Sequence, residues 1–152
     1  MGLNIQDLEI TSPAFDNGGR MDSKYARDGD DISPPLEWSG VPEGTAELVI
    51  VVHDPDAPLP YGFCHGVLSG IPADVTEIPE GGGNEYTRGK NDFGDEGYGG
   101  PMPPEGHGPH HYYFWIYALD TETEGPLSRR EFLDRYGDNI IEQNRVIGVY
   151  ER

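Results

Sequence analysis

The chain has 152 residues, of which 35% are hydrophobic, so it can form one domain with a buried core. Its 28 acidic residues outnumber its 10 basic residues, and the formal net charge is −18 at pH 7. No basic stripe is present to neutralise phosphates, which excludes nucleic acid as an expected partner. We therefore expect a single domain over residues 1–152.

Two further features bear on the compartment. The sequence shows no signal peptide, and no apolar run reaches the roughly 20 residues that span a bilayer. We therefore expect no integral membrane association. The single cysteine, Cys64, rules out an internal disulfide and favours a cytoplasmic protein.

The acidic balance also predicts a salty environment. Lys24 and Lys90 are the two lysines of the whole chain. A charge of −18 would repel itself strongly in dilute buffer. In multimolar salt the screening length falls to about 3 Å, and that repulsion largely disappears. We interpret the composition as adaptation to a hypersaline cytoplasm, as in a halophilic archaeon. The alternative is an ordinary acidic protein with a basic partner.

The first half of the chain predicts three strands separated by loops. Residues 5–11 alternate weakly between apolar and polar side chains and form the first candidate. Residues 28–44 are rich in Asp, Pro and Gly and predict an extended loop. Residues 47–53 (ELVIVVH) are apolar on both faces and predict a buried strand, and residues 64–68 predict a shorter one.

A long loop then leads into the most strongly predicted strand. Residues 81–108 contain ten glycines and three prolines, and a loop of this length in a compact domain is usually functional. Tyr86, Phe93 and Tyr98 within it indicate that it packs against the fold. Residues 112–119 predict a strand because aromatic and other apolar side chains fill the run.

Helices are predicted late in the chain. Ser128 and Glu131 have the spacing of a capping box, and Gly137 is placed to end the helix. A second short helix is predicted over residues 139–143, and residues 145–150 (RVIGVY) predict a final strand. The class is therefore mainly β with a few peripheral helices.

Three of the five histidines, His107, His110 and His111, lie where the glycine-rich loop meets the strand. A flexible loop beside a rigid strand holds polar side chains at the mouth of a pocket, so this segment predicts a binding site. Strand alternation places His110 and Tyr112 on one face, where a ring N–H and a phenol O–H can reach one ligand. The alternative is that both side chains only pack in the core.

Two carboxylates follow the buried strand. Asp54 lies at its exit, and Asp56 projects from a turn that two prolines hold rigid. A carboxylate at the end of a buried strand costs free energy unless a hydrogen-bond donor or a cation pairs with it, so these two residues indicate a binding site. Alternatively, they cap backbone N–H groups as structural turn residues. His65 on the shorter strand is a third candidate, although a lone histidine there is usually a core residue.

Enzyme templates fit poorly. The sequence contains no Gly-x-Ser-x-Gly elbow, no Walker loop and no dinucleotide fingerprint. Cys64 and His65 are neighbours, so on a strand they point to opposite faces and cannot pair as nucleophile and base. No zinc-type ligand spacing occurs either. We expect no catalytic residues, no metal ion and no cofactor.

Several segments, in their order and spacing, match a known family. Near the N-terminus these are Ser12 to Phe15 and Gly29 with Ile32-Ser33-Pro34-Pro35-Leu36-Glu37-Trp38. Further on they are Asp54-Pro55-Asp56-Ala57-Pro58, Asn91-Asp92-Phe93-Gly94, Gly97-Tyr98-Gly99-Gly100-Pro101-Met102-Pro103-Pro104 and Gly108-Pro109-His110. Over nearly its whole length the chain resembles the phosphatidylethanolamine-binding protein family, in its bacterial and archaeal branch of Raf-kinase-inhibitor-like proteins.

The resemblance implies a mainly β fold with a large central antiparallel sheet, a smaller sheet packed on it and short helices near the C-terminus. It also implies a small pocket that accepts anions such as acetate or the phosphate of phospholipid headgroups. Carried over by position, the pocket residues are Asp54, Ala57, Pro58, His65, Gly100, Pro104, His110 and Tyr112, with Asp56 supporting the wall.

Two positions depart from the family pattern. His111 stands where the family commonly has Arg, so an ion pair with a nearby acid is lost or becomes pH-dependent, and we expect a looser wall. Met102 stands where the bacterial branch often has cysteine, which should affect packing more than chemistry.

The leading hypothesis is weak, non-catalytic binding of a small anion or a phosphorylated headgroup. His65 and His110 would donate hydrogen bonds, helped by Tyr112 and by backbone N–H groups near Gly100. Asp54 would orient one imidazole and favour its protonated form. The alternative is a protein that inhibits or regulates a partner kinase or protease through the pocket rim, and a hydrolase is a weaker alternative. Prokaryotic members of the family often form homodimers, so we also expect a dimer.

Overall fold

The longest apolar strand of the first half anchors the fold. In the computed structural model, which describes residues 6–152, all eight residues of β4 (Glu47–Asp54) are buried. A strand buried on both faces needs a layer of structure on each side. β4 accordingly lies inside a six-stranded sheet of order β2-β9-β8-β4-β5-β7.

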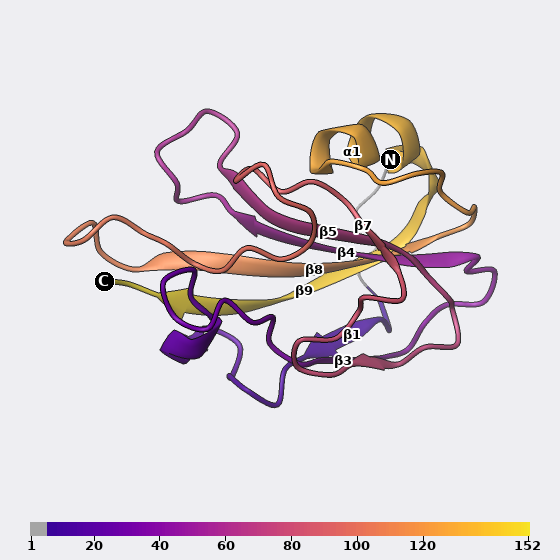
Figure 1. The fold of residues 1–152 in the computed structure, drawn as a ribbon. Helices are drawn as coiled ribbons and strands as arrows, with labels where there is room; N and C mark the ends of the chain where they lie inside the picture. The colour runs from indigo at the N-terminus through magenta and orange to yellow at the C-terminus, as the bar shows by residue number, and fades with distance from the viewer. Residues whose placement is uncertain (1–5) are drawn as a thin grey trace.

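Four long strands form the platform of this large sheet. β5 (Phe63–Ile71) and β8 (His110–Leu119) flank β4 on either side, and β9 (Ile140–Tyr150) follows β8, all antiparallel. The edge strands are short: β2 (Gly19–Arg20) is parallel to β9, and β7 (Thr87–Arg88) is antiparallel to β5. Figure 1 shows the large sheet nearly edge-on, with the loops gathered at its ends.

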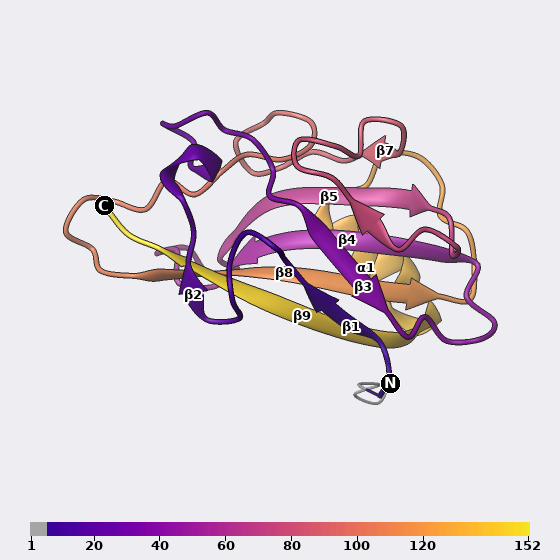
Figure 2. The same cartoon turned by 90° about the horizontal axis from the view of Figure 1, so that it is seen from below.

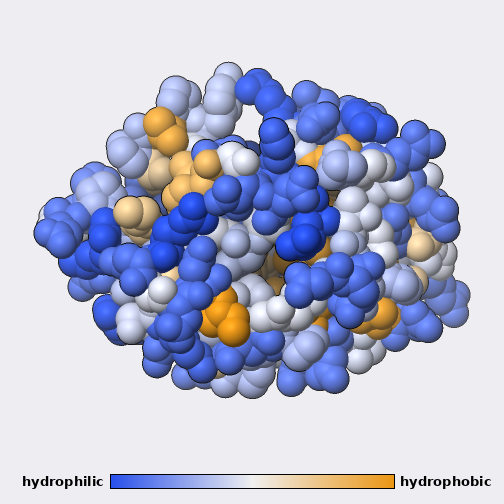
Figure 3. Space-filling view, viewed as in Figure 1, coloured by the Kyte–Doolittle hydropathy of each residue, from blue (hydrophilic) through white to orange (hydrophobic). Residues whose placement is uncertain are grey.

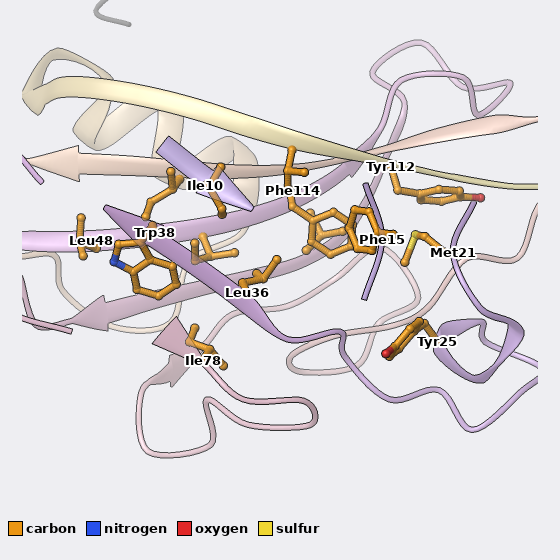
Figure 4. Packing of buried hydrophobic residues seen from close by; sticks show 14 of the residues in the cluster. Ile10, Phe15, Met21, Tyr25, Leu36, Trp38, Leu48, Ile78, Tyr112 and Phe114 are labelled. Atoms are coloured by element: carbon orange, nitrogen blue, oxygen red, sulfur yellow. The ribbon is translucent and has the colours of Figure 1, made fainter. Parts of the chain in front are cut away.

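A second sheet covers one face of the first. It has the order β1-β3-β6, with β1 (Glu9–Thr11), β3 (Leu36–Ser39) and β6 (Glu77–Ile78). Figure 2 shows β1 and β3 crossing the large sheet obliquely. Apolar side chains from both sheets, such as Trp38 and Phe114, fill the space between them (Figure 4). The large and small sheets implied by the family resemblance are therefore both present.

One α-helix covers the opposite face. α1 (Arg129–Tyr136) buries Phe132 in a smaller core beneath it. The predicted capping box is confirmed, because Ser128 and Glu131 exchange backbone-to-side-chain hydrogen bonds of 3.1 Å in both directions. The helix ends at Gly137, as predicted. Within residues 6–152 the other helical elements are two 3-10 turns, η1 (Ser23–Tyr25) and η2 (Gly137–Asn139).

Several elements differ from the sequence predictions. Residues 28–44 were predicted as loop throughout, but β3 forms within them because Leu36 and Trp38 alternate inward and pair with both neighbours of the small sheet. The predicted short helix over residues 139–143 is wrong. Asn139 ends the 3-10 turn η2, and residues 140–143 begin β9, which pairs with β8 along nearly its whole length. This long-range pairing overrides local helix preference. The first predicted strand is shorter than expected, and Ile5 lies outside the described residues.

The surface carries most of the charge without compensating cations. Hydrophilic residues dominate the face shown in Figure 3. Within residues 6–152, the Lys and Arg side chains that pair with carboxylates do so at 2.8 to 3.5 Å in the pairs Lys24–Glu80, Arg27–Asp31, Arg27–Asp95 and Arg152–Asp28. Most acidic side chains in that part of the chain therefore have no Lys or Arg partner.

We expect the folded state to depend on salt. Raising KCl from dilute to multimolar concentration should raise Tm, because screening removes repulsion among the unpaired carboxylates. Each gain of about 1 kcal/mol corresponds to roughly 2–4 °C in a chain of this size. Thermal melts followed by circular dichroism measure the effect. A sucrose series is the control, because sucrose is excluded from the protein surface but does not screen charge. A Tm that stays constant or falls with KCl would contradict the expectation.

Candidate functional site

Two cavities open on the face of the large sheet that meets the small sheet. The larger, about 360 Å³, lies between the sheets on apolar side chains such as Ile50, Leu68 and Phe114, with exposed Arg88 and Glu96 at its rim. No histidine lines it. The chemistry predicted from the sequence therefore does not lie in the larger cavity.

The smaller cavity, about 260 Å³, holds the predicted residues. It forms where the end of β4 meets the starts of β5 and β8, which antiparallel pairing brings to one edge of the sheet. Seven of the nine predicted site residues line it: Asp54, Ala57, Pro58, His65, Pro104, His110 and Tyr112. Five further residues, which were not among the predicted site residues, also line it: Leu59, Phe63, Phe93, Met102 and Pro103. A polar cluster thus lies within largely apolar walls.

Asp54 and His110 form the buried centre of the site. Oδ2 of Asp54 lies 2.7 Å from Nδ1 of His110, and each side chain is 3% exposed. A carboxylate accepts, so Nδ1 of His110 carries a proton and donates it. Oδ1 of Asp54 accepts the backbone N–H of Asp56 at 2.7 Å. One oxygen of Asp54 therefore orients the imidazole of His110, and the other caps the turn.

A β-bulge decides which residue of β5 faces the cavity. Val52 pairs with Gly66 and the next residue, His53, pairs with Cys64, so His65 is an extra residue in the ladder. Bulges re-aim side chains, often next to functional sites. His65 lines the cavity, whereas Cys64 packs in the core beneath α1. Regular alternation from Gly66 would have turned His65 to the other face.

The ring of His65 is fixed by one hydrogen bond and by aromatic packing. Its Nδ1 lies 2.7 Å from the carbonyl oxygen of Gly99. A carbonyl only accepts, so Nδ1 carries the proton and a neutral His65 keeps a lone pair on Nε2. Burial lowers the pKa of His65, which favours this neutral form near pH 7. The rings of Phe63, Phe93 and Tyr112 lie 4.9 to 5.5 Å from it, centroid to centroid.

Tyr112 contributes a hydroxyl without a partner. The side chain lines the cavity, and its ring extends away from Phe15 and Phe114 in Figure 4. Its buried hydroxyl has no hydrogen-bond partner among residues 6–152. Burial raises the pKa of Tyr112 well above its usual value, so the group stays protonated and can donate. Buried hydroxyls without a partner are uncommon in folded proteins, so this one calls for an explanation.

Two predicted residues lie outside the cavity. Oδ2 of Asp56 accepts hydrogen bonds of 2.7 Å from the backbone and from ring Nδ1 of His111, which stands where the family usually has Arg. Burial alone would raise the pKa of Asp56, but these hydrogen bonds outweigh burial and hold it below its usual value. The His111 imidazole therefore helps to hold the turn that carries Asp56 against strand β8, where the family usually has Arg.

Gly100 acts as a close-packing residue. Its N–H donates to Oδ1 of Asp31 at 2.7 Å, and the N–H of Gly99 donates to the carbonyl of His65 at 2.8 Å. The expectation that backbone N–H groups near Gly100 help bind an anion is therefore wrong for Gly99 and Gly100, whose N–H groups already have partners within the protein. A Cβ at Gly100 would lie 2.1 Å from the carbonyl oxygen of Tyr25, so glycine is required by backbone approach.

The single cysteine of the chain, Cys64, is buried and does not line the cavity. Burial raises the pKa of the Cys64 thiol to about 11, and the thiol lies across the sheet from the cavity. No group of three or more His, Cys, Asp or Glu side chains within residues 6–152 is arranged to hold a metal ion. Over the same residues, no helix is long and apolar enough to cross a membrane.

Removing the Tyr112 hydroxyl should stabilise the free protein. Tyr112→Phe deletes a buried group with no partner, so we expect the free energy of unfolding to rise by about 1 kcal/mol. Tyr98→Phe is the matched control. The Tyr98 hydroxyl donates to the carbonyl of Tyr25 at 2.8 Å, so its loss should destabilise by a similar amount. Denaturant unfolding in KCl measures both, and equal losses would show that the Tyr112 hydroxyl is satisfied.

Comparisons with known proteins agree with this architecture. A family profile described as "Phosphatidylethanolamine-binding protein" matches residues 11–151. The "UPF0098 protein PH1269" of Pyrococcus horikoshii is 42% identical over 161 residues, which cover 99% of this chain and 80% of the relative.

Two solved bacterial structures are similar in fold as well as in sequence. A putative phosphatidylethanolamine-binding protein homologue from Chlamydia trachomatis has a TM-score of 0.88 at 33% identity, covering 95% of this chain and 97% of the other. Escherichia coli YbcL has a TM-score of 0.89 at 34% identity, covering 97% and 99%. From its sheets, its motifs and these matches, the chain belongs to the phosphatidylethanolamine-binding protein family.

Proposed function

We propose that the protein is a non-catalytic binding protein for a small anion or a phosphorylated headgroup, held in the 260 Å³ cavity. The observation that carries the proposal is the buried hydroxyl of Tyr112, which has no partner within residues 6–152 and belongs to a residue that lines the cavity with His65 and His110. A few convergent polar groups within apolar walls are typical of small-ligand sites. The names of the family and of the Chlamydia structure, which refer to binding of phosphatidylethanolamine, support a headgroup of this class.

The protonation state of His65 sets the chemistry of binding. In the neutral ring, Nε2 is an acceptor and suits a ligand that brings a proton, such as a phosphate monoester in its singly charged form. The second pKa of such a phosphate is about 6, so this form is available near neutral pH. When His65 gains a proton, Nε2 becomes a charge-assisted donor to any oxyanion. Anion binding is thus coupled to proton uptake.

The residues of the cavity favour binding over reaction. No serine, threonine, cysteine or lysine lines it, and the thiol nearest in sequence, Cys64, lies in the opposite core. Hydroxyl, thiol or amine nucleophiles of the usual kind are therefore missing from the cavity wall. A hydrolase would have to use Asp54, His65, His110 or Tyr112, or water activated by one of them.

A regulatory role toward a partner kinase or protease is the second candidate. The exposed large hydrophobic side chains of residues 6–152 are Leu59, Tyr61 and Met102, exposed by 52%, 69% and 48%. Leu59 and Met102 also line the cavity, so exposed apolar surface gathers at its rim. Apolar surface of this kind is commonly a contact surface for another molecule.

Titration with phosphoethanolamine tests the proposed function. Calorimetry in multimolar KCl should show saturable, weak binding to the wild type. Tyr112→Phe should weaken it about tenfold or more, because a hydrogen bond to a charged group is lost. His110→Gln keeps a donor for Asp54 and should abolish most of the affinity. No binding to folded wild type would contradict the proposal and favour the regulatory alternative.

Anion affinity should rise as the pH falls. Burial lowers the pKa of His65, so the protonated donor form is absent near pH 7 and appears only as the pH falls through that pKa. We expect sulfate, whose own charge stays constant, to bind more tightly from about pH 7 to about pH 5, by up to about tenfold per pH unit. His65→Gln should flatten the profile. An affinity that is level in the wild type, or that increases toward alkaline pH, would rule out the proton coupling.

A further inference from the structure

Nε2 of His110, the ring nitrogen that does not contact Asp54, already has another side chain as its hydrogen-bond partner. Nδ1 of His107 lies 2.7 Å from Nε2 of His110, and the two ring centroids are 4.9 Å apart. His107 belongs to the loop before β8 and is absent from the family pocket implied by the sequence. The inference that follows rests on the proposed function, because it concerns how a ligand reaches this site.

The proton positions on His110 and His107 decide which ring donates and which accepts in this contact. The carboxylate of Asp54 requires a proton on Nδ1 of His110, so a neutral His110 presents a lone pair at Nε2. His107 then donates its own Nδ1–H to that lone pair. If His110 is protonated, it donates instead, and His107 accepts. In both states the two ring nitrogens of His110 are engaged within the protein, and neither is free for a ligand.

The surroundings of His107 let its side chain move without breaking the loop. Gly106 and Gly108 flank it with φ of 71° and 88°, and nothing lies within 4 Å of a Cβ placed on either. The His107 side chain is exposed, unlike that of His110. The backbone is held separately, because the N–H of Gly106 donates to the carbonyl of Arg152 at 3.0 Å. The imidazole can therefore rotate away from His110 while the loop stays in place.

We propose that His107 is a displaceable internal ligand of the cavity. It fills the hydrogen-bonding position at Nε2 of His110 in the free protein, and an incoming oxyanion or hydroxyl replaces it there. The cavity then accepts only ligands whose oxygen competes with an imidazole for His110. This competition lowers the affinity for all ligands and raises the discrimination against those without a polar oxygen.

His107→Ala tests the proposal by removing the competitor. Calorimetric titration with inorganic phosphate in multimolar KCl should give binding about two- to tenfold tighter than wild type, the range set by the net worth of one hydrogen bond. Glu105→Gln is the matched control, since Glu105 is an exposed side chain on the same loop. The control should bind as the wild type does.

Free imidazole provides a second readout. Added to His107→Ala, it should occupy the vacated position and weaken phosphate binding, while leaving the wild type nearly unaffected. Phosphate binding to wild type that is equal to or tighter than binding to His107→Ala would overturn the internal-ligand proposal and leave the proposed function standing. Binding of phosphate and phosphoethanolamine to none of these folded proteins would overturn the proposed function, and the inference with it.

Discussion

The hydrogen bond between Asp54 and His110 is the interaction on which the site depends. It joins the end of β4 to the start of β8 across 56 positions of sequence, inside a region where both side chains are 3% exposed. A buried carboxylate without a partner would destabilise the fold by several kcal/mol, and the hydrogen bond between Asp54 and His110 offsets that cost. The second oxygen of Asp54 holds the following turn through Asp56. One carboxylate thereby orders the imidazole and the loop that forms one wall.

The rest of the site follows from where strands end and where one of them bulges. Antiparallel pairing brings the end of β4 and the starts of β5 and β8 to one edge, and the bulge turns His65 toward it. The glycine-rich loop supplies apolar walls such as Phe93 and Pro104, and its backbone approaches Tyr25 closely at Gly100. The sheet gives the polar groups rigidity, whereas the loop gives access and carries His107.

The acidic surface and the buried site belong to different electrostatic regimes. Surface carboxylates are screened by salt within a few ångströms, but contacts such as Asp54–His110 are shielded from solvent and keep their strength. A chain with a net charge of −18 would repel an anion approaching through dilute buffer. High salt removes that long-range barrier and would leave the short-range hydrogen bonds of the cavity to decide the affinity of the proposed anion site. That proposed site and an acidic surface are therefore compatible in a hypersaline setting, which is the environment that the composition predicts.

The sequence by itself determined the features that depend on neighbouring residues. The mainly β class, the buried strand β4, the alternation that places His110 and Tyr112 on one face, and the capping box at Ser128 all follow from local spacing. The ordered motifs identified the family, and they pointed to seven residues that line the cavity. Only the tertiary structure decided which face of the sheet His65 takes and that β9 begins at Ile140. It also decided that the N–H of Gly100 donates to Asp31 and that His107 contacts Nε2 of His110. Most of these depend on strand register and on partners far along the chain. The contact between His107 and His110 spans three residues, but it depends on the glycine loop conformation and on Asp54 fixing the His110 ring. Local periodicity carries no information about either.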